Sequence, residues 1–345
     1  MSRPHNVEVT DSPRTRPRPT MDDVAAAAGV SRGTVSRVLN GGQNVSRDAL
    51  GAVERAIRRT GYVANPHARS LVTQRSSSVA FILNEAQDRL FEDPTFHYLL
   101  RGCTQSLAAH DITLLLTVVE SEDDRQRLRR WISAGHVDGA LLVSGHRDSP
   151  LLGDLLAQGV PLVVSGRPLG HERSVSYAAA DDRDGARQMA AHLRSRGRRR
   201  IAVITGPPDT SGGLDRLAGF TDVLGPPDPA LVAAGDYTEE SGFAAMETLL
   251  ASVPDLDAVF VCSDLMAAGA MTALRRAGRT IPGDVAVGGF DDAKLAAASD
   301  PPLTTVRQPW QRLSAEMVRL LLGRIAGDEP AAAILPADLI IRAST

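Results

Sequence analysis

Residues 20–42, TMDDVAAAAGVSRGTVSRVLNGG, decide the fold of the N-terminal part of this chain. Thr20 is a good helix cap, and Asp22 and Asp23 follow it in the first turn, where carboxylates interact favourably with the positive end of a helix. Gly29 ends this helix because glycine readily adopts the positive φ of a helix C-terminus. The pattern predicts a short first helix.

Two more helices follow. Ser31 caps the second, and the third extends from about Ser46 to Thr60. Apolar side chains recur every three to four residues in both, as in helices with one buried face. The side chains predicted to face inward are Val35, Val38, Leu39, Leu50, Val53 and Ile57.

The spacing of the first two helices predicts a helix-turn-helix. The small side chain of Ala25 allows the two helices to approach each other closely, and Gly29 makes the tight turn between them. Val35 and Val38 pack the pair of helices against the third helix. Such a unit inserts the start of its second helix into the DNA major groove. The residues placed there are Ser31, Arg32, Gly33, Thr34, Ser36 and Arg37. A generic three-helix bundle is the alternative, but it gives no reason for this exposed side to be short, polar and basic.

Charge is distributed unevenly along the chain. Residues 1–75 hold 12 arginines and 6 acidic residues, whereas the remainder holds 26 basic and 35 acidic residues. A basic head on an acidic body indicates a polyanion-binding module, although an arginine-rich solvated face is an alternative. Residues 1–19 are rich in Pro, Arg and Ser and are expected to be a disordered tail.

From Val79 onward, wholly apolar strands alternate with amphipathic helices. This pattern predicts parallel sheets covered on both faces, here two doubly wound lobes of the periplasmic-binding-protein-like type. Ligands in such folds bind at the carboxyl ends of the strands, here in the cleft between the lobes. The strands are VAFIL (79–83), ITLLLTVV (112–119), VDGALLVS (137–144) and VPLVVS (160–165), then IAVIT (201–205), AVFVCS (258–263) and VAVGGF (285–290).

No catalytic constellation is evident, so we expect no enzyme, no catalytic residue, no cofactor and no metal site. The sequence has no glycine-rich nucleotide loop after the first strand, no nucleophile elbow and no metal-ligand spacing among its eight histidines. Asp181-Asp182 and Asp291-Asp292 are adjacent carboxylates, which more often act as helix caps or acceptors than as acid and base.

The sequence also favours a cytoplasmic protein without a membrane partner. It contains no apolar run of 18 residues and no apolar signal segment at its start. Cys103 and Cys262 lie far apart in apolar segments, which favours buried reduced thiols over the alternative of a disulfide.

The stretch from Thr20 to Leu71 resembles the N-terminus of the lactose-repressor (LacI/GalR) family of transcription regulators. The pieces DVA, AGVS, TVSRVLNG, GY followed by N, and a closing A-R-x-L carry the resemblance. It implies that Arg32 and Gly33 occupy the two positions that most strongly set operator preference, and that glycine there is a departure. The further residues expected at DNA are Thr20, Asn40, Tyr62, Asn65, Ala68, Arg69 and Leu71.

Residues 65–76 are expected to form the hinge that follows the helix-turn-helix domain of residues 20–64. Asn65-Pro66 is a good helix start, but about two turns are too few to be stable alone. The segment should therefore fold when two copies meet on DNA, with Leu71 as an apolar wedge in the minor groove and Arg69 at the phosphates. A leucine that packs on a lobe is the alternative.

The resemblance continues through residues 77–345, the expected effector-binding and dimerisation domain. It implies that Arg216 grips effector hydroxyls, that Asp291 accepts hydrogen bonds from the ligand, and that Tyr237 stacks on it. The alternatives are a salt-bridging helix residue for Arg216, a cap of the following helix for Asp291 and a half-buried core aromatic for Tyr237. Ser263 and Gly166 stand where many members have Asn and Asp, and the loop EAQDRLFEDPTF is longer than usual. The expected effector-binding residues are Asp88, Phe91, Phe96, Arg167, Arg216, Tyr237, Ser263, Asp264 and Asp291.

These residue types favour a sugar effector, because a guanidinium, a carboxylate and an aromatic ring suit a polyol. A purine or nucleoside is the alternative ligand. The function expected is that of a homodimeric repressor that binds a pseudo-palindromic operator and responds to this effector. A two-lobed sugar-binding transport protein is the alternative from another class.

Overall fold

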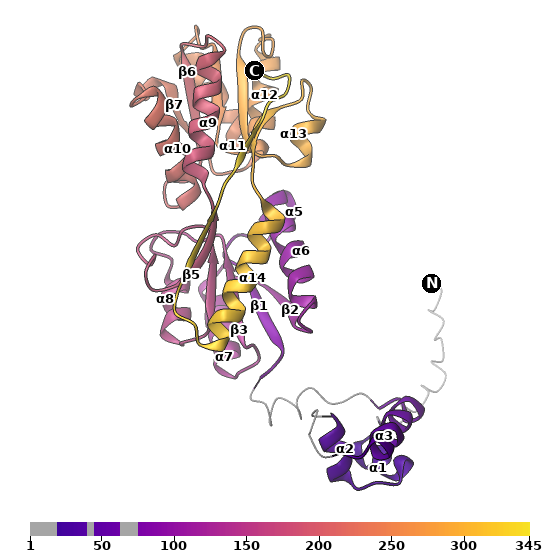
Figure 1. Ribbon diagram of the computed structural model, residues 1–345. Helices are drawn as coiled ribbons and strands as arrows, with labels where there is room; N and C mark the ends of the chain where they lie inside the picture. Colours follow the sequence, from indigo (N-terminus) through magenta and orange to yellow (C-terminus); the bar gives the residue numbers. More distant parts are fainter. Residues whose placement is uncertain (1–18, 40–44, 63–74) are drawn as a thin grey trace, which may run out of the picture. The chain divides into compact units, whose positions relative to one another are not determined.

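The computed structural model describes residues 19–39, 45–62 and 75–345 (Figure 1). The chain divides into two compact units, residues 1–76 and residues 77–345. We call the first the head and the second the body, and each is described by itself.

Within its described residues, the head contains three helices: α1 (Met21–Ala28), α2 (Arg32–Leu39) and α3 (Arg47–Thr60). Thr20 and Asp23 form a reciprocal capping box at the start of α1, and Gly29 ends that helix at φ 67°. The predicted helix-turn-helix is therefore present. Its core consists of Val24, Ala25, Val35, Val53, Ala56 and Tyr62.

One inward position was predicted wrongly in the head. Leu50 is 40% exposed, whereas the buried face of α3 begins one turn later, at Val53 and Ala56. An apolar residue in the first turn of a helix satisfies the sequence periodicity even when no neighbouring helix reaches that turn.

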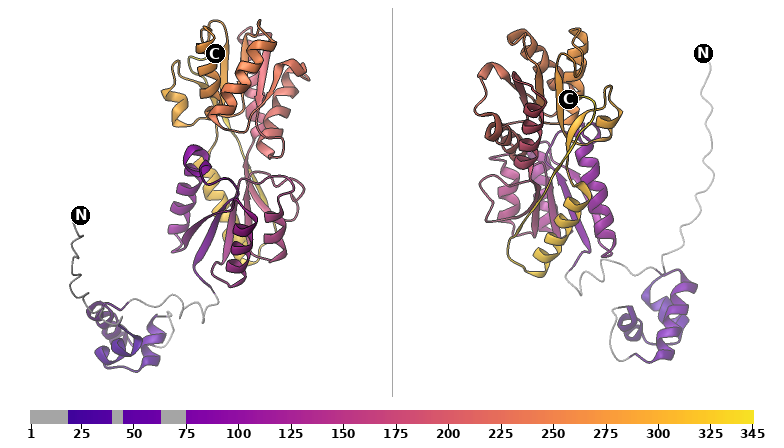
Figure 2. Two further views of the ribbon diagram at one scale, coloured as in Figure 1. Left: turned by 180° about the vertical axis from the view of Figure 1, so that it is seen from behind. Right: turned by 45° about the horizontal axis from the view of Figure 1, so that its top comes forward.

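The body contains two six-stranded sheets (Figures 1 and 2). Lobe 1 is the sheet of strand order β11-β5-β4-β3-β1-β2, and all of its strand pairs are parallel. Its strands are β1 (Ser78–Leu83), β2 (Thr113–Val118), β3 (Gly139–Val143), β4 (Leu162–Ser165), β5 (Ser176–Ala180) and β11 (Ala332–Leu335). Its helices are α5 (Arg89–Glu92), α6 (Pro94–Ala108), α7 (Glu122–Ser133), α8 (Pro150–Ala157) and α14 (Trp310–Ala326).

Both faces of the lobe 1 sheet are buried, which explains why β1 is apolar throughout. Val79, Phe81 and Leu83 pack with side chains of α6 and α14, whereas Ala80 and Ile82 pack with those of α7 and α8. Successive strand residues point to opposite faces, so a strand covered on both sides has no polar alternation.

Lobe 2 is the sheet of order β12-β10-β9-β8-β6-β7, in which only the edge strand β12 runs antiparallel. α9 packs against α10, and α11 packs against α12. Its strands are β6 (Ile201–Thr205), β7 (Val232–Ala234), β8 (Ala258–Val261), β9 (Ala286–Asp291), β10 (Thr304–Arg307) and β12 (Asp338–Ile340). Its helices are α9 (Asp182–Ser195), α10 (Ser211–Leu224), η1 (Pro229–Leu231), α11 (Glu239–Ser252), α12 (Asp264–Arg276) and α13 (Lys294–Ala298).

The chain passes between the lobes three times: after β5, after β10 and after β11. The sequence pattern indicated one lobe followed by the other, but α14 and β11 return to lobe 1, where Figures 1 and 2 show α14 beside α6. The crossing segments bring the carboxyl ends of both parallel sheets to one cleft.

Cys103 and Cys262 are both free and buried, as predicted. Burial in apolar surroundings raises the pKa of each thiol to about 12, so both remain protonated and unreactive at neutral pH. Within the described residues, no helix is both long enough and apolar enough to span a membrane.

Candidate DNA-reading helix and effector cavity

The first turn of α2 presents polar side chains to solvent. Ser31, Arg32 and Gly33 are exposed, and the Ser31 hydroxyl caps the helix by accepting a hydrogen bond from the backbone N–H of Thr34 at 3.2 Å. Arg32 lies 3.7 Å from Asp22, and both side chains are about two-thirds exposed. Because such a surface ion pair contributes little free energy, the Arg32 guanidinium is free to exchange Asp22 for a base edge.

Gly33 is not required by packing. A Cβ at this position would meet only Ser31 Oγ at 3.7 Å and the end of Arg37 at 3.9 Å, both ordinary contact distances. The helix would therefore tolerate a side chain here, and packing within the head does not explain the glycine.

The remaining residues predicted at DNA differ in placement. The Thr20 hydroxyl is engaged with Asp23, and Tyr62 is only 8% exposed because its ring packs into the head core. Tyr62 is thus part of the head core, and its predicted contact with DNA stays a prediction. Ser36 and Arg37 both lie on α2, where Ser36 is half-buried and Arg37 is exposed. Those outside the described residues are Asn40, Asn65, Ala68, Arg69 and Leu71.

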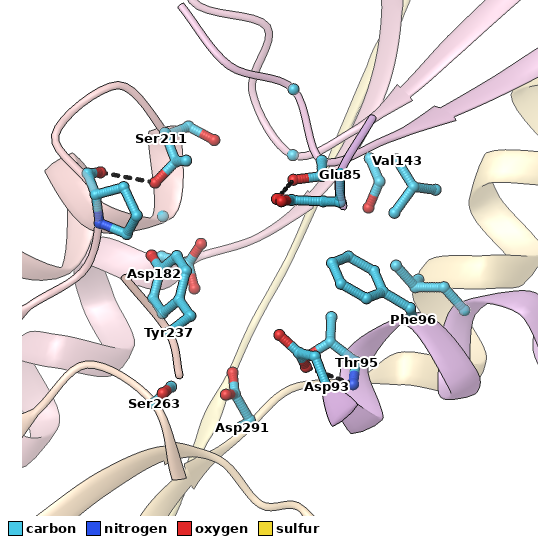
Figure 3. A pocket seen from close by; sticks show the side chains of 18 of the residues that line it. Glu85, Asp93, Thr95, Phe96, Val143, Asp182, Ser211, Tyr237, Ser263 and Asp291 are labelled. Carbon is cyan, nitrogen blue, oxygen red and sulfur yellow. Dashed lines mark hydrogen bonds between the residues drawn. The ribbon is translucent and has the colours of Figure 1, made fainter. Parts of the chain in front are cut away.

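The body contains a cavity of about 470 Å³ between its lobes (Figure 3). Its walls are the loops after β1, β3, β4 and β5 of lobe 1 and after β6, β7, β8 and β9 of lobe 2, together with α6 and α14. This is the carboxyl edge of both sheets, where parallel α/β folds bind ligands.

Arg216 of α10 is the polar centre of the lobe 2 wall. Its guanidinium donates to Asp182 Oδ1 at 3.1 Å and to the Cys262 carbonyl at 2.6 Å, and lies 3.4 Å from Asp291 Oδ1. It also lies over the Phe290 ring, 3.8 Å from the centroid. Burial opposes this charge, but the two carboxylates outweigh it and raise the pKa of Arg216 above its ordinary value. The cation is therefore permanent.

Asp291, at the end of β9, shares this network. Its Oδ1 accepts from the Gln308 amide at 2.8 Å, and its backbone carbonyl accepts from the Trp310 indole at 3.2 Å. Burial raises the pKa of Asp291 to about 7 in spite of Arg216, with a further increase from the negative charge of Asp93. The carboxyl group therefore titrates near neutral pH.

Aromatic and aliphatic surfaces complete the cavity. Phe96, Leu99, Trp310 and Leu313 line it from lobe 1, and Tyr237 lines it from lobe 2. Flat rings from both lobes offer stacking surfaces for the C–H faces of a sugar or for a base.

The rim carries a polar contact between the lobes. His146, after β3, lies 2.9 Å from Asp209 on the loop after β6 and 3.2 Å from Glu85 after β1. Hydrogen bonding to Glu85 is the main cause that raises the pKa of His146 to about 9, with Asp209 adding to it. The imidazole is therefore a cation at neutral pH, held between two carboxylates.

Three lining residues hold unusual backbone conformations: Ser144 (φ 62°), Tyr237 (φ 71°) and Asp291 (φ 115°). Non-glycine residues at positive φ cost on the order of 1–3 kcal/mol and persist where the surroundings constrain them. Their gathering at one cavity is typical of a functional site.

Five residues predicted for effector binding line this cavity: Phe96, Arg216, Tyr237, Ser263 and Asp291. Ser263 is only 4% exposed, and its hydroxyl also caps α12 by accepting from the Met266 backbone.

Four predicted residues do not line it. Arg167 is paired with Asp215 at 2.6 Å, and Asp264 is fully buried, accepting hydrogen bonds from the Thr305 hydroxyl and from the Ala293 backbone. Asp88 and Phe91 belong to the longer loop, which forms α5 and points both residues outward, leaving Phe91 79% exposed. Their proximity in sequence to the strand ends does not bring their side chains into the cavity.

Several lining residues were not predicted from the sequence. Glu85 and His146 are each the second residue after a predicted strand, so the rule that ligands bind at strand ends was sufficient to find them. Asp93 and Trp310 begin helices, and no local signal distinguishes them from ordinary helix-terminal residues. Among the described residues, no group of three or more His, Cys, Asp or Glu side chains is arranged to hold a metal ion.

Known proteins are similar to both units. Residues 20–65 match the family of bacterial regulatory proteins described as lacI, and residues 190–345 match the periplasmic binding protein-like domain. The HTH-type transcriptional regulator CelR of Thermobifida fusca is 45% identical over 336 residues, covering 95% of this chain and 99% of that protein.

Solved structures of transcriptional regulators are also similar to this chain. A transcriptional regulator CelR-cellobiose complex is 43% identical, with a TM-score of 0.77 over 95% of this chain and 100% of that one. The lac repressor dimer bound to operator and the anti-inducer ONPF is 26% identical, with a TM-score of 0.84 over 95% of this chain and 99% of that one. A transport protein would not carry the helix-turn-helix head, so that alternative is excluded. The chain belongs to the lacI family of bacterial regulatory proteins and is a DNA-binding transcriptional regulator controlled by a small molecule.

Proposed function

We propose that this regulator is a repressor whose effector is a glucose disaccharide such as cellobiose, bound between the two lobes. The observation that carries this proposal is the cavity itself, in which aromatic rings from both lobes flank a centre of Arg216 and carboxylates. Rings stack on the C–H faces of a sugar, and the charged groups accept and donate hydrogen bonds at its hydroxyls. The similarity to the CelR-cellobiose complex over nearly the full chain supports the same choice.

The cavity volume of about 470 Å³ lies within the range of small-molecule sites, roughly 300–1,000 Å³. A nucleoside is the second candidate, because Tyr237 and Trp310 also suit a base. The abundance of carboxylates favours the sugar, since a polyol offers a hydroxyl donor on nearly every carbon and a purine base offers few.

On the DNA side, we infer that two copies bind a pseudo-palindromic operator through α2, with Arg32 as the principal base-reading side chain. A two-fold dimer reads two half-sites related by the same symmetry. Leu71 and Arg69 retain their proposed roles at the hinge, although they lie outside the described residues. We place the protein in the cytoplasm, where it has access to the chromosome, and assign it no catalytic activity.

The test is a titration of operator affinity with effector. An operator is first selected from random duplexes, and its affinity for the full-length protein is measured by fluorescence anisotropy at fixed salt, since phosphate contacts make affinity depend steeply on salt. We expect cellobiose to weaken operator binding by about 5- to 150-fold, the usual range of allosteric coupling.

Maltose and adenosine serve as comparison ligands in the same titration. If adenosine alone changes operator affinity, the effector is a nucleoside and not a sugar. If no ligand of the panel changes operator affinity, the effector proposal is refuted. If the sugar tightens operator binding instead of weakening it, the proposal that the sugar relieves repression is refuted.

A further inference from the structure

Asp93 is a cavity residue from lobe 1 that the sequence did not single out. It precedes α6, where its Oδ1 accepts a hydrogen bond from the Thr95 backbone at 2.9 Å. Its Oδ2 accepts from the Arg89 guanidinium at 3.1 Å, and the side chain is only 14% exposed. The carboxylate is thus held in place by a backbone N–H and an arginine, and each oxygen retains a lone pair for a further donor.

Asp93 faces Asp291, which belongs to the other lobe. Figure 3 shows both carboxyl groups directed into the same part of the cavity. The negative charge of Asp93 also contributes to the raised pKa of Asp291. Asp291 is positioned by Gln308 and Arg216 much as Asp93 is positioned by Thr95 and Arg89. Each lobe therefore presents one arginine-anchored carboxylate to the ligand space.

The charges that line the cavity are predominantly negative. Three cations line it, namely Arg89, Arg216 and His146, and each is already paired with a carboxylate. The carboxylates that line it are Glu85, Asp93, Asp182, Asp209, Asp236 and Asp291. An anionic ligand would therefore meet an excess of like charge among the side chains that line the cavity.

We propose that Asp93 and Asp291, one from each lobe, accept hydroxyl hydrogens from a single uncharged sugar, and that this carboxylate pair excludes sugar phosphates and sugar acids. The inference rests on the proposed sugar effector and specifies its chemical class. Two like charges that face the same space repel one another, and hydroxyl donors placed between them stabilise both charges and weaken that repulsion.

The test compares Asp93→Asn with Asp228→Asn in the full-length protein by isothermal titration calorimetry. Asp228 is an exposed residue of lobe 2 that caps η1 by the same hydrogen bond to a backbone N–H two residues ahead, at 3.0 Å. The control therefore reproduces the capping role of Asp93 without the cavity. Cellobiose is the neutral probe, and cellobiose phosphorylated at a 6-hydroxyl is the anionic probe.

The wild type should bind cellobiose at least 100-fold more tightly than the phosphorylated sugar. Asp93→Asn should weaken cellobiose binding by about 10- to 100-fold, as expected for loss of a hydrogen bond to a charged group. The same substitution should also reduce the ratio of the affinities for cellobiose and phosphorylated cellobiose, because one negative charge is removed from the cavity. Asp228→Asn should change neither quantity. Added salt should reduce the discrimination if charge, rather than bulk, causes it.

Several outcomes would overturn the inference. Equal affinity of the wild type for the neutral and phosphorylated sugars would do so, as would cellobiose affinity within twofold of wild type in Asp93→Asn. Those results leave the sugar effector itself intact. If no sugar binds the wild type, the proposed function fails and this inference fails with it. A thermal melt of each variant separates loss of binding from loss of folding.

Discussion

The Nδ1 atom of His146 in lobe 1 lies 2.9 Å from Oδ2 of Asp209 in lobe 2. A backbone hydrogen bond of 2.7 Å from the Arg147 N–H to the Asp209 carbonyl accompanies this contact, and His146 forms an isolated bridge with Thr210. The loops after β3 and β6 are therefore joined at the rim of the effector cavity. This contact belongs to the arrangement of lobes seen in this structure and depends on the charge of one imidazole.

His146→Gln should lower the stability of the body at neutral pH by roughly 1 kcal/mol, because a partly exposed ion pair contributes about that much. The pKa of His146 is raised from 6.5 to about 9 in the folded protein. Its contribution is therefore complete below pH 6.5 and is lost as pH rises through 9. Melting curves of wild type and variant should differ at pH 7 and converge at pH 10. His110→Gln, at an exposed position in lobe 1, is the control. A difference in melting temperature between wild type and His146→Gln that is the same at pH 7 and pH 10 would contradict a stabilising role for the imidazolium charge.

Arg216→Ala should destabilise the body by about 3–5 kcal/mol, because it leaves the carboxylates of Asp182 and Asp291 buried without their cation. Urea unfolding followed by circular dichroism measures the change. Arg319→Ala, at an exposed position on α14, should lie within about 0.5 kcal/mol of wild type. Equal stabilities of the two variants would show that Arg216 is not the centre of the network.

Effector affinity should depend on pH through Asp291, whose pKa is raised by burial to about 7. Sugar hydroxyls donate to the carboxylate form, so binding releases a proton wherever Asp291 is protonated in the free protein. Cellobiose affinity should therefore rise by up to about tenfold per pH unit between pH 5.5 and 7, and it should become constant above pH 7. Calorimetry across this range measures it, and Asp291→Asn should show weak binding without this dependence. Affinity that increases as pH falls would refute the assignment.

Gly206→Ala should displace the Tyr237 ring, because a Cβ at position 206 would overlap the phenol. Overpacking of this kind costs about 1–3 kcal/mol and here moves a wall of the cavity, so cellobiose affinity should fall by about tenfold. Gly153→Ala on α8 is the matched control, since its Cβ would have no neighbour within 4 Å. Unchanged affinity in Gly206→Ala would remove Tyr237 from the ligand contacts.

Arg32→Ala should weaken binding to the selected operator by about 5- to 150-fold, the effect of losing a bidentate contact worth about 1–3 kcal/mol. Binding to a random duplex should change much less, because a base contact carries the loss. Anisotropy titrations on both duplexes provide the comparison. Equal losses on the two duplexes would make Arg32 a phosphate contact instead.

Local signals were sufficient to predict the head. Caps at Thr20, Ser31 and Ser46 and left-handed glycines at positions 29 and 61 specify where each helix begins and ends, and these effects act within one or two turns. The parallel sheets were likewise predictable, because strands buried on both faces are apolar at every position. Short strands such as β7 and β12 were missed, since three residues carry no measurable periodicity.

The lining of the cavity between the lobes was predictable only in part. Arg216, Tyr237, Ser263 and Asp291 were found because they follow strand ends in segments that resemble known regulators. Asp93 was not found, because its importance depends on a residue 198 positions later in the chain, on the other lobe.

The sequence by itself determined the helix-turn-helix, the apolar strands and the charge of each unit, because these follow from neighbouring residues. Only the tertiary structure decided that α14 and β11 return to lobe 1, that Asp93 faces Asp291, and that His146 reaches Asp209. Those relationships arise where the chain crosses between lobes. They depend on the summed packing of two separate sheets, which no short stretch of sequence encodes.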